Sequence, residues 1–189
     1  SRDWSSDVCS SDLIDLEGPD APDWLIDCRG LGARDQLRLR GVRGEVIRLH
    51  APDVTLQRPT RLLHPRYPIY IAPKPNHLFV IGATEIESED LSEASVRSTL
   101  ELLSAAYTVH PGFGEARILE IATQARPTLT DNLPCVNLHG PRHISLNGLY
   151  RHGFLISPAM LDAALEWLQQ ETTEWALRWG LRVEDERNH

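Results

Sequence analysis

The sequence lacks the features that would connect it to a membrane, a nucleic acid or a metal. It has no run of about 18 apolar residues, which a membrane-spanning helix needs. Asp and Glu (27) outnumber Lys and Arg (19), and the net charge of −8 argues against nucleic-acid or anionic-membrane partners. The 3 cysteines and 8 histidines show no C-x-x-C, H-x-H or H-E-x-x-H spacing, so we expect no metal site.

Other missing features limit the expected cellular location of the protein and the reactions it could catalyse. Cys9, Cys28 and Cys135 are widely separated and odd in number, which favours reduced thiols. No secretory pattern opens the chain, so a cytoplasmic protein is expected. No G-x-S-x-G surrounds Ser157 and no carboxylates are usefully paired, so hydrolysis has no support. Gly30 and Gly32 are too few for the G-x-G-x-x-G that holds a dinucleotide pyrophosphate.

The most informative stretch runs from residue 143 to residue 168 and predicts a strand, a tight loop and a helix. Ile144 and Leu146 alternate with polar residues, which indicates a half-buried strand. Ser157-Pro158 predicts the start of the helix. The free N–H groups of a helix start, with Arg151 before it, favour an anion, although a core strand and helix with a surface arginine also explain the pattern. The residues expected on the buried helix face are Leu161, Ala164, Leu165 and Leu168.

The residues from Gly41 to about residue 125 predict a mostly antiparallel sheet with one helix packed on it. Runs of β-branched or aromatic residues bounded by Pro, Gly and Asn predict strands, with KPNH as a hairpin loop and residues 115–125 as another strand. The predicted strands are GVRGEVIRL, RLLH, YPIYIAP and HLFVIGATEIE. Residues 92–107 predict a helix whose apolar face carries Val96, Leu100 and Leu103.

Charged segments are expected at the surface. A basic run indicates either a phosphate or nucleic-acid patch or a solvated turn and strand face, and the acidic net charge favours the second. Its members are Arg34, Arg38, Arg40, Arg43 and Arg48. His139 and His143 flank a turn and are expected to be exposed. The C-terminal tail is expected to be helical to Trp179, with residues 184–189 frayed.

Five segments between Ile14 and Trp179 resemble, in order, the D-amino-acid oxidase family of FAD-dependent oxidoreductases, and its bacterial glycine oxidase branch of thiamine synthesis most of all. They are DCRGLGARD, VRGEVIRL, YIAPKPNHLFVIGATEIE, ARPTLTDNLPCV and LNGLYRHGFLISPAM. The resemblance implies an α+β (α/β) fold, the C-terminal part of a two-domain FAD-dependent oxidoreductase.

The resemblance also implies a division of the chain. Residues 14–40 are expected to be a remnant of the FAD-binding domain, 41–130 the substrate-binding domain, 131–179 the return to the FAD-binding domain, and 180–189 a frayed tail. Residues 1–13 show no structural period and resemble a translated sequencing adaptor; a disordered natural N-terminus is the alternative. On the adaptor interpretation the chain is a C-terminal fragment whose dinucleotide motif lies upstream.

The family's functional residues map onto specific positions. The resemblance implies that Arg151 and Tyr70 bind the substrate carboxylate and that Arg126 lines the same pocket. It implies no catalytic side chain, because a hydride passes directly to the flavin. His152 stands where the glycine oxidase motif can have Asn, which leaves the substrate open. The residues implied to contact FAD are Leu149, Tyr150, Arg151, His152, Gly153, Phe154, Leu155, Cys28 and Gly30.

The implied reaction oxidises glycine or a similar small amine that carries a carboxylate. FAD and oxygen take part, and the products are a 2-oxo acid, ammonia and hydrogen peroxide; a homo-oligomer is compatible with it. One alternative is another family member, such as a sarcosine oxidase or a D-amino-acid dehydrogenase. The alternative of another class is an inactive fragment that binds no FAD and therefore purifies colourless.

Overall fold

The computed structural model describes residues 22–64 and 68–186. The expectations for residues 1–13, for Cys9 and for residues 187–189 lie outside the described residues. The described chain divides into two compact units. One unit is Gly41–Ala125, and the other combines the chain up to Arg40 with the chain from Arg126 onward. We call them the central unit and the terminal unit.

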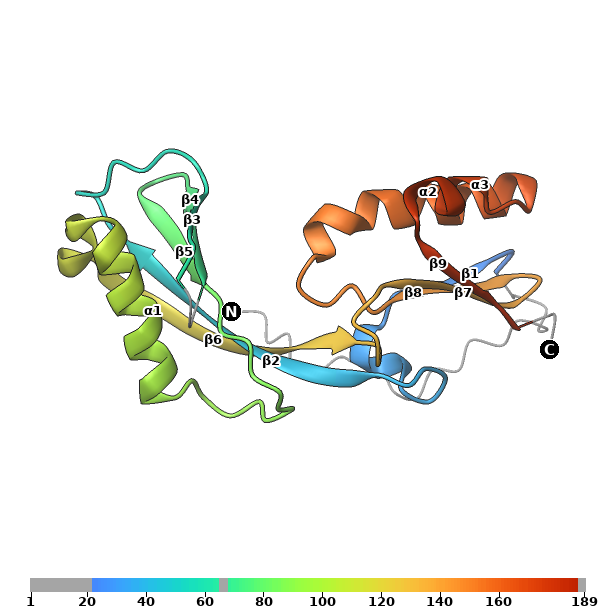
Figure 1. Cartoon of the computed structure of the whole chain (residues 1–189), viewed down its shortest axis with the longest axis horizontal. Helices are drawn as coiled ribbons and strands as arrows, with labels where there is room; N and C mark the ends of the chain where they lie inside the picture. The colour runs from blue at the N-terminus through green and yellow to red at the C-terminus, as the bar shows by residue number, and fades with distance from the viewer. Residues whose placement is uncertain (1–21, 65–67, 187–189) are drawn as a thin grey trace. The chain divides into compact units, whose positions relative to one another are not determined.

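The central unit contains a five-stranded sheet in the order β3-β4-β5-β2-β6 (Figure 1). The pairs β3–β4, β4–β5 and β5–β2 are antiparallel, as the sequence predicts. Lys74 opposes Leu78 across the β4–β5 hairpin, and the positive φ angles of Asn76 and His77 close the predicted loop. The strand bounds are β2 Arg40–His50, β3 Thr60–Leu62, β4 Ile69–Lys74, β5 Leu78–Gly82 and β6 Arg117–Thr128.

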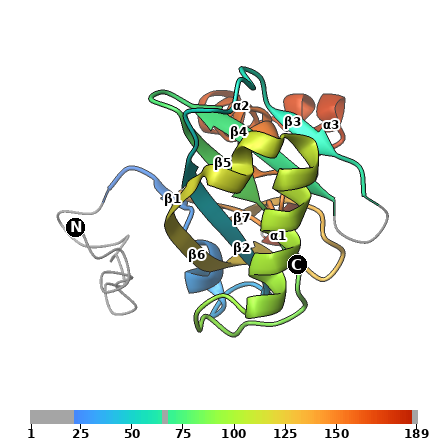
Figure 2. The same cartoon turned by 90° about the vertical axis from the view of Figure 1, so that its left-hand side faces the viewer.

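Helix α1 (Val96–Val109) and the short 3-10 helix η2 (Pro111–Glu115) cover this sheet (Figure 2). The Ser95 hydroxyl caps α1 by accepting a hydrogen bond from the Ser98 N–H at 3.1 Å. The predicted buried face is wrong in part, because Val96 and Leu100 are 77% and 60% exposed. The residues that α1 buries instead are Ser98, Leu102, Ala105 and Ala106.

The rotation of α1 follows from a polar requirement. The Ser98 hydroxyl bonds to the carboxylate of Glu45, which is fully buried in the sheet. A buried carboxylate must be hydrogen-bonded, so Ser98 faces the sheet and Val96 and Leu100 turn to solvent. Leu102 then packs on a core that includes Ile47, Ile71, Phe79 and Ile81.

The terminal unit contains a four-stranded sheet in the order β1-β8-β7-β9. The pairs β1–β8 and β7–β9 are parallel, and β7–β8 is antiparallel. The helices α2 (Gly153–Gln170) and α3 (Glu174–Trp179) lie over one face of this sheet (Figure 1). The remaining bounds are β1 Leu25–Asp27, the 3-10 helix η1 Gly30–Ala33, β7 Cys135–Gly140, β8 His143–Asn147 and β9 Arg182–Asp185.

Helix α2 begins five residues before its predicted first residue, Pro158. It starts at Gly153, so Pro158 lies inside it and Ser157 does not cap it. The Ser157 hydroxyl instead donates to the Gly153 carbonyl at 2.5 Å. Of the predicted buried face, Leu161 and Leu165 are 48% and 40% exposed. The residues that α2 buries are Met160, Ala163, Ala164 and Trp167.

Two further expectations differ from the structure. The tail does not fray at residues 182–185, because these residues form β9 and pair with β7. The side chain of His139 is only 10% exposed, and the Nε2 atom of His143 is buried. His139 lies in β7 and His143 in β8, and only two residues separate these strands. The turn residues in the sequence therefore suggested an exposed loop where the histidines are in fact part of the sheet. None of the described helices is long and apolar enough to cross a membrane.

Candidate functional site

The candidate site of the terminal unit lies at the carboxyl ends of two neighbouring parallel strands. Asp27, the last residue of β1, is the register partner of Ser145, near the end of β8. The turn that follows each strand therefore leaves the same edge of the sheet. In open α/β sheets this edge is where ligands bind.

Asn147 holds the two turns together. This last residue of β8 is fully buried. Its Nδ2 donates to the Gly30 carbonyl at 2.9 Å, and its Oδ1 accepts from the Gly148 N–H at 2.8 Å. Gly30 has a φ of +59°, and a Cβ atom there would lie 3.5 Å from Cγ of Pro127. The Gly30 turn, the β8 turn and the residue after Arg126 are thus neighbours.

A backbone hydrogen bond connects the segments that carry the two candidate arginines. The Tyr150 N–H donates to the Pro127 carbonyl at 3.2 Å. Tyr150 precedes Arg151 and Pro127 follows Arg126, so the structure brings the two backbones together. Arg151 is exposed and Arg126 is half-buried, and each has a further interaction within the fold.

Arg40 braces the same region from the other side of the turn that follows β6. Its guanidinium donates to the Leu129 carbonyl at 2.8 Å and to Oδ1 of Asn132 at 2.7 Å. Gly148 approaches this turn so closely that a Cβ atom would lie 2.7 Å from Cδ1 of Leu129. Its φ of +74° also requires glycine. The loop is therefore built by packing as well as by hydrogen bonds.

The start of α2 completes the candidate surface. His152 occupies the N-cap position and makes no side-chain capping hydrogen bond. A Cβ atom on Gly153 would meet no atom within 4 Å, and Phe154 is fully exposed. The early start of α2 places its positive end directly after Arg151, closer than the sequence predicted. Such an end favours a carboxylate or developing negative charge.

Asp27 and Arg29 stabilise the turn that contains Cys28. Arg29 donates from its backbone N–H to Oδ1 of Asp27 at 2.9 Å, and from Nε and NH2 to Oδ2 at 2.9 and 2.7 Å. Burial alone raises the pKa of the Asp27 carboxyl, but these bonds outweigh it and hold that pKa below its usual value. Partial burial, with the charge of Asp27, raises the pKa of the Cys28 thiol.

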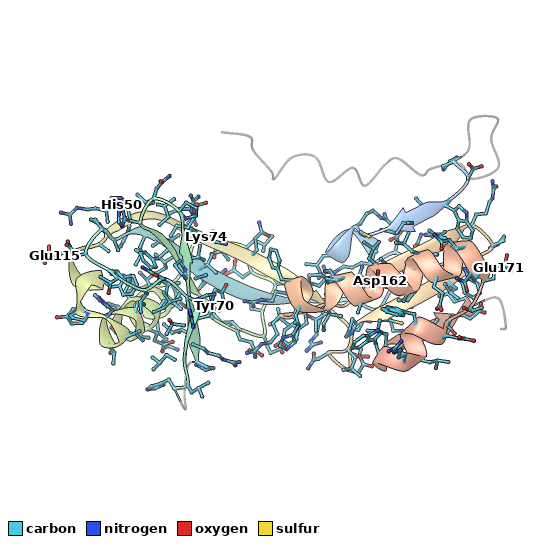
Figure 3. All side chains as sticks on the ribbon, turned by 90° about the horizontal axis from the view of Figure 1, so that it is seen from above. His50, Tyr70, Lys74, Glu115, Asp162 and Glu171 are labelled. Atoms are coloured by element: carbon cyan, nitrogen blue, oxygen red, sulfur yellow. The ribbon has the colours of Figure 1, made fainter. Side chains whose placement is uncertain are left out.

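Tyr70 belongs to the central unit. It lies on β4 (Figure 3). It is directly opposite Gly82 on β5 and is 43% exposed. Its hydroxyl makes no hydrogen bond to a residue of the ranges 22–64 and 68–186. That Tyr70 faces the same cavity as Arg126 and Arg151 stays a prediction.

Sequence reasoning missed several residues that build this region. The dipeptide Asn147-Gly148 by itself predicts only a turn, although an Asn at a strand end can hydrogen-bond a second turn. Arg43, expected on a solvated face, is buried against Glu45, with side chains 6% and 1% exposed. Arg40 and Arg48 also have partners, Asn132 and Glu120. No sequence signal distinguished these arginines from exposed ones.

A second polar cluster crosses the terminal sheet. Nε2 of His139 lies 2.8 Å from the Ser145 hydroxyl, and its Nδ1 lies 2.9 Å from a Glu186 carboxylate oxygen. The rings of His139 and His143 are 4.6 Å apart. The order Glu–His–Ser resembles a hydrolytic triad, but Ser145 is fully buried and cannot reach a substrate. We therefore regard the cluster as structural.

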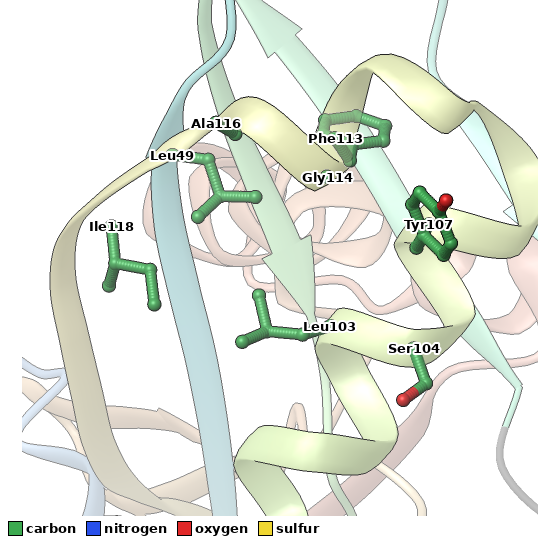
Figure 4. Close-up of a pocket in the computed structure, with 8 residues that line it drawn as sticks. All are labelled: Leu49, Leu103, Ser104, Tyr107, Phe113, Gly114, Ala116 and Ile118. Atoms are coloured by element: carbon green, nitrogen blue, oxygen red, sulfur yellow. The ribbon is translucent and has the colours of Figure 1, made fainter.

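A pocket of about 310 Å³ lies within the central unit (Figure 4). It lies beside α1, η2 and β6, and neither Tyr70 nor any charged side chain lines it. The pocket therefore lacks the guanidinium groups with which Arg126 and Arg151 are expected to bind a substrate carboxylate. Its main lining residues are Leu49, Leu103, Ser104, Tyr107, Phe113 and Ile118.

Comparison with known proteins agrees with these features. Residues 11–166 match the FAD dependent oxidoreductase (DAO) family, and the chain belongs to this family. It is 52% identical over 139 residues to a candidate thiamine biosynthesis oxidoreductase, ThiO, of Rhizobium etli, which covers 73% of this chain and 42% of that protein. It is 31% identical over 132 residues to glycine oxidase of Geobacillus kaustophilus, which covers 68% of this chain and 34% of that enzyme.

Solved structures support the fold. The crystal structure of the Geobacillus kaustophilus glycine oxidase matches with a TM-score of 0.66 at 27% identity, over 81% of this chain and 43% of that one. Iminodiacetate oxidase from Chelativorans sp. BNC1 matches with a TM-score of 0.68 at 22% identity, over 86% and 47%. The predicted α+β fold with an antiparallel sheet is confirmed. The chain spans less than half the length of each of these relatives.

FAD is the cofactor of this family. The terminal unit fits one part of FAD, because an uncapped helix start and an open glycine can face the flavin ring. Reduced flavin carries negative charge that the positive end of α2 would stabilise. The phosphate-binding G-x-G-x-x-G motif is not among the 189 residues.

Proposed function

We propose that this chain forms the substrate-binding side and the flavin-ring contacts of an oxidase acting on glycine or another small amine with a carboxylate. Loss of a hydride converts the amine to an imine, which water hydrolyses to a 2-oxo acid and ammonia. Oxygen is reduced to hydrogen peroxide, and the enzyme serves thiamine biosynthesis. The 52% identity to the ThiO relative supports the pathway. The glycine oxidase relative supports the substrate class.

One observation carries the proposal. The hydrogen bond between the Tyr150 N–H and the Pro127 carbonyl joins the segments of Arg126 and Arg151 beside the start of α2. Two guanidinium groups and a positive helix end make a surface for a small anion. The carboxylate of an amino acid is such an anion.

The residues of this chain bind and orient the substrate in the proposed mechanism. Arg151 forms paired hydrogen bonds with the carboxylate, Tyr70 donates one from its phenol, and Arg126 lines the same pocket. This grip directs the α C–H bond toward the flavin. FAD, when bound, accepts the hydride and passes the electrons to oxygen. No side-chain base is needed if the amine binds deprotonated.

The contact residues proposed for FAD are those of the loop and helix start at 149–155, with Cys28 and Gly30 from the neighbouring turn. The buried Asn147 ties Gly30 to that loop, so both can approach one ligand. His152 occupies the N-cap position of α2 without a side-chain capping hydrogen bond, and it is the residue at which we expect a substitution to change substrate choice most.

Steady-state peroxide production by the FAD-loaded enzyme tests the proposal. Glycine, sarcosine and D-alanine are compared at equal concentrations, with oxygen uptake measured in parallel. Glycine turnover with stoichiometric peroxide is the expected result. Fast oxidation of D-alanine with no reaction of glycine would overturn the substrate assignment. Reduction of an added electron carrier without peroxide would indicate a dehydrogenase instead.

A further inference from the structure

Tyr70 and Gly82 form an unusual cross-strand pair. They are register partners in the antiparallel β4–β5 pair, and partners of this kind project their Cβ atoms toward the same face. A Cβ atom built on Gly82 would lie 2.5 Å from both Cζ and the hydroxyl oxygen of Tyr70, and 3.0 Å from Cε1. The phenol ring therefore occupies the volume that any other side chain at position 82 would fill.

The backbone under the ring is held firmly. β5 is an interior strand, and Gly82 is aligned with Tyr70 on one side and Val46 on the other. Two residues later, the Thr84 N–H donates to the Glu45 carbonyl at 3.2 Å. The Glu45 N–H in turn donates to the Thr84 hydroxyl at 2.9 Å. The backbone and the side chain of Thr84 thus each make a hydrogen bond to Glu45, and these two bonds attach the chain just after β5 to β2.

A buried ion pair reinforces this attachment. Arg43 donates to one carboxylate oxygen of Glu45 from Nε at 2.9 Å and from NH2 at 2.7 Å. The same arginine also donates to the Glu93 carbonyl at 2.8 Å. Breaking such a buried pair is costly, so the strand end cannot move easily. The Tyr70 ring is 43% exposed and can move.

We propose that Gly82 is a positioning residue that sets where the Tyr70 hydroxyl meets the substrate carboxylate. The proposal rests on the proposed function, because it assumes that Tyr70 contacts the substrate. A methyl group at position 82 displaces the ring toward solvent and leaves the strand in place. The Tyr70 ring can lie against β5 because Gly82, opposite it, has no side chain.

Substrate kinetics of the FAD-loaded enzyme test the functional half of the proposal. Gly82→Ala is expected to raise KM about tenfold, the effect of losing one hydrogen bond to a charged group, with kcat changed little. Tyr70→Phe is expected to raise KM equally. The double variant is expected to match either single variant, since a ring without its hydroxyl makes no hydrogen bond to the carboxylate that a displacement could remove. Additive losses in the double variant would show a general structural effect and overturn the proposal.

The position of the ring is tested independently of turnover. In protein labelled with 3-fluorotyrosine, the Tyr70 resonance is assigned by its loss in Tyr70→Phe. Gly82→Ala is expected to shift this resonance and leave those of Tyr107 and Tyr150 unchanged. Gly140→Ala is the matched control, because a Cβ atom at Gly140 meets nothing within 4 Å.

The two experiments separate the possible failures. An unmoved Tyr70 resonance in Gly82→Ala would overturn the packing claim whatever the substrate is. A moved resonance with unchanged KM for a working substrate would overturn the link between Gly82 and binding. If none of glycine, sarcosine and D-alanine is oxidised, the proposed function fails, and the resonance still decides whether Gly82 positions the ring.

Discussion

The two units bury their polar groups in different ways. Among the described residues of the central unit, the buried charges are Arg43 and Glu45, which pair with each other beside an apolar core of sheet and helix. In the terminal unit, buried polar residues are spread along the strands and their ends, and they hold turns in place. These residues are Asp27, Thr128, Asn137, Ser145 and Asn147.

The central unit therefore acts as a rigid sheet, whereas the candidate surface of the terminal unit is made of loops at strand ends. A rigid sheet can present one side chain accurately, as the central unit does with Tyr70. Loops at strand ends can bring several short segments to one surface, but each needs its own hydrogen-bonded support. Four substitutions test this contrast, in order of decreasing expected effect.

Removal of Arg43 should have the largest effect on stability. Arg43→Ala leaves the Glu45 carboxylate buried without its guanidinium partner, at a cost of about 3 to 5 kcal/mol. Urea unfolding of the variant and the parent measures it. Arg48→Ala is the control, because Arg48 and Glu120 are about half exposed and such pairs contribute less than about 1 kcal/mol. Equal losses in both variants would contradict the claim that the buried Arg43–Glu45 pair contributes more to stability than the half-exposed Arg48–Glu120 pair.

Loss of Arg151 should affect binding rather than folding. Arg151→Ala in the FAD-loaded enzyme is expected to raise KM about a hundredfold, because the loss of charge-assisted hydrogen bonds to the carboxylate costs about 3 kcal/mol. The melting temperature should change little for this exposed residue. Arg178→Ala, on α3, is a control of the same charge change outside the candidate site. A KM unchanged in Arg151→Ala would remove this arginine from the site.

The loop of the terminal unit should be sensitive to a single methyl group. Gly148→Ala combines a positive φ with a contact to Leu129, and the expected destabilisation is about 1 to 3 kcal/mol. Flavin affinity should fall with it, measured by fluorescence titration of the apoenzyme. Gly153→Ala has open space around its new Cβ atom and should unfold like the parent. Similar losses in the two variants would contradict the packing account.

The smallest expected effect is a pH dependence from His143. Burial and nearby His139 lower the pKa of the His143 imidazole, partly offset by Asp27. The unfolded chain therefore binds more protons than the fold, so the free energy of unfolding decreases as pH falls through the ordinary histidine pKa of about 6.5. Urea midpoints at pH 8, 6 and 5 measure this slope. His143→Gln should flatten it; an unchanged slope would assign it to other groups.

A second decrease in the free energy of unfolding is expected at lower pH. Burial alone raises the pKa of the Glu45 carboxyl, but hydrogen bonds from Ser98 and Arg43 outweigh it and leave that pKa below its usual value. Asp27 behaves alike. Their contribution to stability is complete above the ordinary carboxyl pKa of about 4 and is lost as pH falls below it.

The sequence by itself determined the strands of the central sheet, the β4–β5 hairpin and the strand, loop and helix around residues 143–168. These follow from local alternation, turn residues and helical spacing, which act over a few positions. Its five matching segments also identified the family and its cofactor.

The tertiary structure alone decided which faces are buried and which distant groups meet. Val96 and Leu100 are exposed because the buried carboxylate of Glu45 requires Ser98 on the inner face of α1. Residues 182–185 form a strand because the edge of β7 offers unpaired backbone groups. Hydrogen bonds between residues far apart in the chain, such as Asn147 with Gly30, leave no periodic signal in a single sequence, because each partner is an ordinary polar residue until the fold brings them together.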